Sequence, residues 1–77
     1  MNITNKTLDL HGIKHKDVPT IVDKFIGTHL MNNTYHIQII TGRSEKMKHL
    51  VSRVLDDYEL YATDHVLNSG MLTVNLT

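Results

Sequence analysis

The sequence predicts an α+β or α/β two-layer sandwich of order βαβαββ, with a four-stranded mixed sheet and two helices on one face. Two observations lead to this fold class. Segments with apolar period two alternate with segments of helical period, in the order strand, helix, strand, helix. Two further strand-like segments then follow, joined by a short loop with Asn and Gly. Strand–helix–strand units pair their strands in parallel, and the closing hairpin adds an antiparallel strand.

The first strand–helix pair covers the N-terminal half of the chain. Residues 7–11 alternate, with Leu8 and Leu10 on one face and polar residues on the other. Residues 17–31 have apolar side chains at helical spacing, which predicts an amphipathic helix. Asp17 is a suitable N-cap for that helix.

The second half of the chain repeats this pattern and ends in a hairpin. Residues 35–40 are β-branched and aromatic, which favours a strand. Residues 45–58 form a second amphipathic helix, with Ser44 as the expected N-cap. Residues 60–66 and 71–76 are the two strands of the hairpin.

Length and composition restrict the class of protein. The chain has 77 residues, so we expect a flexible N-terminus at residues 1–6 and a single domain at residues 7–77. It has no cysteine and no long apolar run, so we expect a soluble, cytoplasmic protein without a membrane partner. Lys and Arg number 8 and Asp and Glu number 8, so binding to nucleic acid requires a local basic patch.

Three polar, glycine-containing segments are expected to meet. The loops after the two parallel strands emerge at one edge of the sheet, and the last strand begins at that same edge. This edge therefore receives residues 11–12, residues 41–44 and residues 68–70. Any small α/β domain has such an edge, so convergence alone does not specify a function.

The residues at this edge resemble the motifs of the Smr (small MutS-related) domain family. Residues 8–12 read LDLHG, as the opening motif of the family does. Residues 39–42 resemble the second motif, an apolar strand that ends in HG or TG, and residues 68–76 resemble the closing asparagine–glycine segment and strand. The three matches occur in the family's order, and the resemblance implies the same βαβαββ fold.

The resemblance implies nicking or cleavage of RNA or structured DNA, with Asp9 and His11 as catalytic residues. A carboxylate beside an imidazole can orient the ring for general acid–base catalysis. The same pair can hold a divalent cation such as magnesium, and no structural metal site is expected. The alternative is that Asp9 caps a turn and His11 hydrogen-bonds the backbone at the strand end.

Nucleic-acid contacts are predicted for the polar and basic residues of the three loops: Gly12, Lys14, Thr41, Gly42, Arg43, Ser44, Lys46, Asn68 and Gly70. Exposed N–H groups at the start of the second helix favour a phosphate, and Arg43 can add a bidentate contact. Lys14, Lys46 and their neighbours can form the required basic patch. The alternatives are a plain strand-to-helix turn, lysines on solvated helix faces, and a hairpin that needs its own Asn and Gly.

Three functions remain open from the sequence. The second motif of the family usually reads glycine-x-glycine, whereas residues 42–44 lack the second glycine and the helix begins at once. The leading hypothesis is the endonuclease, and this shorter loop supports the alternative, a non-catalytic RNA-, DNA- or ribosome-binding module. Both functions are compatible with a monomer, and a third alternative is a homodimeric accessory protein.

Overall fold

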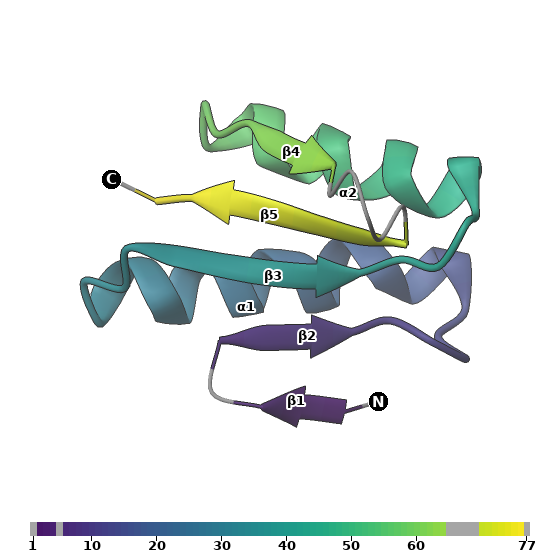
Figure 1. Ribbon diagram of the computed structural model, residues 1–77, viewed down its shortest axis with the longest axis horizontal. Coiled ribbons are helices and arrows are strands. Elements are labelled where there is room, and N and C mark those ends of the chain that lie inside the picture. Colours follow the sequence, from purple (N-terminus) through teal and green to yellow (C-terminus); the bar gives the residue numbers. More distant parts are fainter. Residues whose placement is uncertain (1, 5, 65–69, 77) are drawn as a thin grey trace.

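The computed structural model describes residues 2–4, 6–64 and 70–76. The strands are β1 (Asn2–Thr4), β2 (Thr7–Asp9), β3 (His36–Ile40), β4 (Ala62–Asp64) and β5 (Met71–Asn75). The helices are a 3₁₀ turn, η1 (His15–Asp17), and two α-helices, α1 (Val18–Met31) and α2 (Glu45–Asp57) (Figure 1). The four expected strands and two expected helices are all present, so the βαβαββ order is confirmed.

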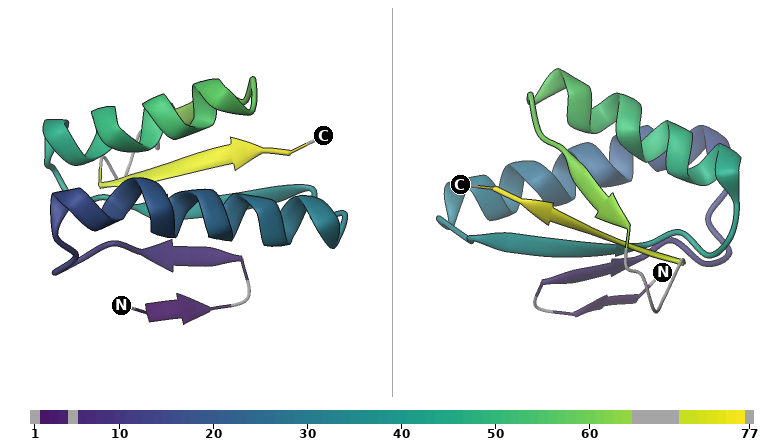
Figure 2. Two further views of the ribbon diagram at one scale, coloured as in Figure 1. Left: turned by 180° about the vertical axis from the view of Figure 1, so that it is seen from behind. Right: turned by 45° about the horizontal axis from the view of Figure 1, so that its top comes forward.

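The strands form one mixed sheet in the order β1-β2-β3-β5-β4. The pair β2–β3 is parallel, whereas β3–β5 and β4–β5 are antiparallel, as the sequence predicts. Both α-helices lie on the same face of this sheet, and among the described residues no helix lies on the other face (Figure 2). The structure therefore has the expected two layers.

Strand β1 is the main difference from the expected fold. The sequence analysis expects a flexible N-terminus at residues 1–6, but residues 2–4 pair antiparallel with β2. Asn2 lies opposite Asp9, and Thr4 lies opposite Thr7. The two residues between β1 and β2 allow a tight hairpin, which adds a fifth strand beside the first predicted one.

The core lies between the sheet and the helices. Alternate residues of the strands are buried on the helix-covered face, among them Leu8, Ile39 and Leu72. The residues between them, such as Gln38 and Thr73, are half-buried and face away from the helices. This alternation is expected of a sheet with one covered face, because successive side chains point to opposite sides.

Both helices end in the same kind of C-cap. Asn33 and Glu59 each have a φ of 58°. After α1 the Thr34 N–H donates to the His29 carbonyl at 3.0 Å, and after α2 the Leu60 N–H donates to the Leu55 carbonyl at 2.9 Å. These bonds close Schellman motifs, in which glycine is the usual left-handed residue. Asn tolerates that conformation, but Glu59 occupies it at a cost.

The N-caps of the helices differ from each other. Ser44 caps α2 as predicted, because its Oγ accepts a hydrogen bond from the Met47 N–H at 3.0 Å. Asp17 makes no side-chain cap bond to α1, because η1 leads directly into the helix and Asp17 already has helical backbone angles. The expectation that Asp17 is a side-chain N-cap is therefore wrong.

A polar contact joins the two helices outside the core. The Tyr58 hydroxyl donates to Asp23 Oδ1 at 2.6 Å, which links the end of α2 to the middle of α1. This hydrogen bond, strengthened by partial burial and by the negative charge of Asp23, raises the pKa of Tyr58 above its usual value of 10.0. Within the described part of the chain, no helix has the length and apolar character needed to cross a membrane.

Candidate functional site

The Leu10–Ile13 turn places His11 at an exposed corner of the sheet edge. Leu10 is fully buried, and its N–H donates to the Ile40 carbonyl at 3.0 Å, which ties the turn to β3. The Ile13 N–H donates back to the Leu10 carbonyl at 3.1 Å. Gly12 has a φ of 79°, which favours glycine at this position. The turn is thus fixed from below, while His11 is open to solvent.

Asp9 contacts the backbone of His11. One carboxylate oxygen of the half-buried Asp9, Oδ1, accepts a hydrogen bond from the His11 N–H at 2.9 Å. This is the turn-capping role that the sequence analysis gives as the alternative for Asp9. Among the described residues no hydrogen bond joins this carboxylate to the imidazole ring. Asp9 therefore fixes the backbone position from which the ring projects.

The turn after β3 uses its N–H groups within the protein. The N–H groups of Thr41 and Gly42 both donate to the Gly70 carbonyl, at 2.8 and 3.0 Å. Thr41 is buried, and its hydroxyl donates to the Gly42 carbonyl at 2.9 Å. These two N–H groups are therefore not exposed donors for a phosphate, and the predicted nucleic-acid contacts of Thr41 and Gly42 stay predictions. These two residues hold the turn against the start of β5.

Gly42 and Gly70 approach each other backbone to backbone. A Cβ atom added to Gly70 would lie 3.2 Å from the Gly42 Cα atom, which is tighter than nine in ten real Cβ contacts. Close packing against Gly42 thus explains why position 70 is a glycine. The hairpin alternative also explains a glycine here, but by the needs of the turn and not by this contact. The other predicted contact in this loop, Asn68, lies outside the described residues.

Cationic side chains surround the edge. Lys14 and Lys16 lie on or beside η1 after the first turn, and Arg43 and Lys46 lie around the start of α2; all four are exposed. Lys48 differs, because its side chain is only 16% exposed and its ammonium lies 3.9 Å from Glu45. The overall charge of the chain is balanced, and at this edge the exposed Asp17 and Glu45 lie among the four cations, so the local excess of positive charge is small.

The start of α2 offers a limited anion site. The Ser44 hydroxyl is occupied by its cap bond to Met47, so the serine is a helix cap in this structure. The N–H groups of the following residues, Glu45 and Lys46, belong to the first turn of the helix, where no backbone carbonyl is available to them. The positive end of the helix and the exposed Arg43 guanidinium both favour a phosphate there.

The three predicted loop segments do meet at this edge. Asp9 pairs with Ile40 in the parallel register, and Ile40 pairs with Met71 in the antiparallel one. The turns that contain His11, Gly42 and Gly70 are therefore neighbours along one end of the sheet (Figure 1). The sequence analysis did not predict the Gly42–Gly70 contact. The glycine in each of the two converging loops was the feature that could have predicted it.

The donor set at the edge is small for a metal ion. In residues 2–4, 6–64 and 70–76, no three His, Cys, Asp or Glu side chains come together. Asp9 and His11 would supply at most two ligands, and one oxygen of Asp9 is already bound to the turn. Proton transfer by the exposed imidazole of His11 would need no metal ion.

Comparisons with known proteins agree with this architecture. The family model of the Smr domain matches residues 8–76. No curated protein matches the chain. Two solved structures share the fold: YdaL, a stand-alone small MutS-related protein from Escherichia coli, and the human small-MutS related domain.

Both structures are similar over most of this chain. YdaL has a TM-score of 0.83 at 19% identity over 92% of this chain, which spans 63% of YdaL. The human domain has a TM-score of 0.75 at 20% identity, with 91% of this chain and 99% of that domain covered. At such identities the likeness establishes the fold alone. Because the family model covers almost the whole sequence, the chain belongs to the Smr domain family, which is associated with nucleic acids.

Proposed function

We propose that this Smr domain is an endonuclease that cleaves RNA in single-stranded or looped regions. One observation carries the proposal: an exposed histidine, His11, lies at the corner of a hydrogen-bonded turn beside a loop that contains Arg43 and Lys46. A general base must be accessible to its substrate and positioned near it; the His11 side chain is exposed, and its backbone N–H is held by Asp9. The neighbouring cationic side chains attract the negatively charged phosphodiester.

The proposed step is an internal transfer within the RNA. The His11 imidazole takes the proton from a ribose 2′-hydroxyl, and the 2′-oxygen attacks the adjacent phosphorus. The bond from phosphorus to the 5′-oxygen breaks, and the leaving oxygen takes a proton from water. The products are a 2′,3′-cyclic phosphate and a 5′-hydroxyl. Arg43 and the first turn of α2 stabilise the charge on the phosphate oxygens, and Asp9 positions His11.

RNA is favoured over structured DNA by the chemistry at the edge. RNA supplies its own nucleophile in the 2′-hydroxyl, so a single positioned base can start the reaction. DNA lacks this group, and its cleavage requires an activated water, for which proteins commonly use metal ions. Asp9 and His11 are the candidate catalytic residues at this edge, and no step of the proposed reaction runs through a cation.

A second candidate, a non-catalytic module that binds RNA or ribosomes, is favoured by a different observation. Asp9 caps its own turn, and the N–H groups of Thr41 and Gly42 are bound to Gly70. The opening motif and the second loop thus both have structural explanations that require no chemistry. In this case the cationic edge would hold the RNA backbone without cleaving it.

The test compares pure protein with His11→Ala on a labelled single-stranded RNA, a hairpin RNA and supercoiled DNA, with magnesium or with EDTA. We expect cleavage of RNA in both buffers, and a fall of about 10²- to 10⁴-fold in His11→Ala. His36→Ala is the matched control, since His36 is exposed at the opposite end of β3. Unchanged cleavage in His11→Ala refutes the catalytic role. RNA binding without cleavage by the wild type supports the module.

A further inference from the structure

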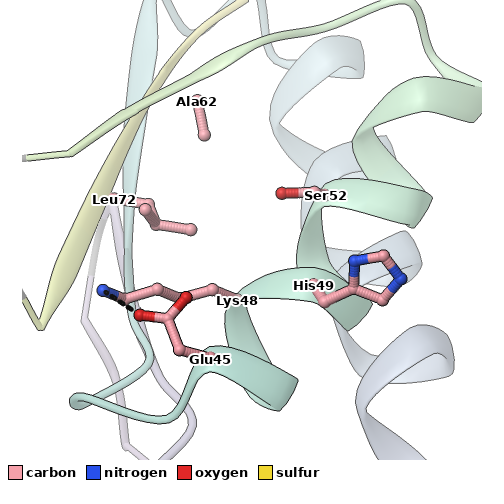
Figure 3. A pocket seen from close by; sticks show the side chains of 6 residues that line it. All are labelled: Glu45, Lys48, His49, Ser52, Ala62 and Leu72. Atoms are coloured by element: carbon pink, nitrogen blue, oxygen red, sulfur yellow. Dashed lines mark ion pairs between the residues drawn. The ribbon is translucent and has the colours of Figure 1, made fainter.

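A cleft of about 300 Å³ lies between α2 and strands β4 and β5, beside the proposed site. Figure 3 shows the six residues that line it: Glu45, Lys48, His49, Ser52, Ala62 and Leu72. Four come from α2, between Glu45 and Ser52, and two come from strands β4 and β5. The size is at the lower end of the range for small-molecule sites, which suits a small ligand.

The cleft adjoins the edge that carries His11 and Arg43. Glu45 is the first residue of α2 and directly follows the Ser44 cap. Leu72 lies two residues after Gly70, which is bound to the turn at Gly42. An RNA strand that passes the start of α2 can therefore place a neighbouring nucleotide in the cleft.

The lining is mostly polar. Ala62 and the buried Leu72 lie at the base of the cleft and expose little apolar surface, and Ser52 points from the helix toward them (Figure 3). The side chain of Lys48 is mostly covered, whereas that of Glu45 is exposed. A base in this cleft would be held mainly by hydrogen bonds to the hydroxyl, ammonium and carboxylate groups.

The charge of the cleft argues against a phosphate as its occupant. Glu45 is 90% exposed at the rim and lies 3.9 Å from the Lys48 ammonium, which it partly neutralises. A carboxylate repels a phosphate but accepts hydrogen bonds from an amino group. An uncharged base with an exocyclic amino group fits these groups better than a phosphate or uracil does.

We propose that this cleft is a subsite for a nucleobase of the bound RNA, selective for a base that carries an exocyclic amino group. The inference rests on the proposed RNA substrate and adds a basis for choosing among RNA sequences. Hydrogen bonding at an exposed rim discriminates modestly, so we expect cytidine to bind roughly two- to tenfold more tightly than uridine.

The test is a titration of ¹⁵N-labelled protein, followed by NMR, with cytidine, uridine and inorganic phosphate. Cytidine should shift the amide signals of Ser52, Ala62 and Leu72 in a saturable way, and phosphate should leave them unchanged. Ser52→Leu fills the cleft and suits a helix, so it should weaken cytidine by at least about tenfold without unfolding the protein. Thr28→Leu, on the exposed face of α1, is the matched control.

Each outcome bears on one of the two proposals. Absence of cytidine shifts at the cleft, or equal affinity in Ser52→Leu, overturns the subsite whatever the protein does to RNA. Saturable cytidine binding in a protein that never cleaves RNA supports the subsite and refutes the endonuclease. Oligocytidylate should bind at least about tenfold more tightly than cytidine, because its phosphates add contacts to Arg43. Equal affinity would assign the cleft to a free nucleoside and overturn the link to RNA.

Discussion

Replacement of Gly70 by alanine tests how the loops of the edge are held together. The added Cβ atom would lie 3.2 Å from the Gly42 Cα atom and 3.4 Å from the Gly42 carbonyl carbon. Both contacts are to backbone, which cannot rotate away as a flexible side chain can. The start of β5 must therefore move away from the turn at Gly42 by a few tenths of an ångström.

This movement strains the hydrogen bonds that the Gly70 carbonyl accepts from Thr41 and Gly42. Overpacking of this kind costs about 1–3 kcal/mol. Alanine also makes the unfolded chain stiffer than glycine does, which returns about 0.4–1 kcal/mol. We expect the free energy of unfolding to fall by about 0.5–2 kcal/mol, which lowers the Tm by roughly 3–12 °C for a domain of this size.

The assay is thermal and urea denaturation followed by far-UV circular dichroism. Gly27→Ala is the matched control, because Gly27 lies within α1 and its added Cβ would make only an ordinary 3.8 Å contact with the Tyr58 hydroxyl. That control should be more stable than the wild type, by about 0.5–1 kcal/mol. A Gly70→Ala protein as stable as the wild type would refute the close approach of the two loops.

Three further predictions concern the C-cap, the helix contact and the cationic edge. Glu59→Gly should raise the free energy of unfolding by about 0.5–1 kcal/mol, because glycine occupies a φ of 58° without strain. Urea denaturation measures this change, and a loss of stability would contradict the Schellman geometry. The raised pKa of Tyr58 means that its bond to Asp23 stabilises the fold below pH 10 and that this contribution is lost as the pH rises through the higher, folded-state pKa. Tyr58→Phe should thus be less stable than the wild type at pH 8, and the difference should shrink at higher pH in melts across this range; a constant difference would argue against the contact. Arg43→Ala should weaken RNA binding and reduce the slope of log K against log salt by about 0.7. The control Arg53→Ala, at an exposed position of α2, should leave the slope unchanged. Equal slopes in the two variants would show that Arg43 does not contact the RNA.

The layers of the fold could be predicted because burial follows local periodicity. Leu8 and Leu10 alternate with polar neighbours, and the structure buries both against the helices. Ser44 was recognisable as a cap because its position before an amphipathic segment is a local signal. In contrast, β1 consists of Asn-Ile-Thr, and three residues with one apolar member carry no readable period.

The parts of the site that escaped prediction depend on contacts between distant segments. Gly70 accepts hydrogen bonds from a turn almost thirty residues earlier in the chain, so the use of the Thr41 and Gly42 N–H groups becomes visible only in three dimensions. Lys48 lies in a charged stretch of α2, yet its side chain is mostly covered, and it shares a cleft with Ala62 of β4 and Leu72 of β5. Glu59 shows that a residue disfavoured by local rules is accepted where the packing of α2 requires a left-handed cap.

The central claim is that His11 performs chemistry on an RNA which other residues hold. The most direct measurement determines, for His11→Ala and wild type on one looped RNA, both the Kd and the single-turnover cleavage rate. We predict a rate lower by about 10²- to 10⁴-fold, a Kd within about threefold of the wild type, and a 2′,3′-cyclic phosphate on the wild-type product. An unchanged rate, or a rate that falls only in proportion to lost binding, would contradict the claim.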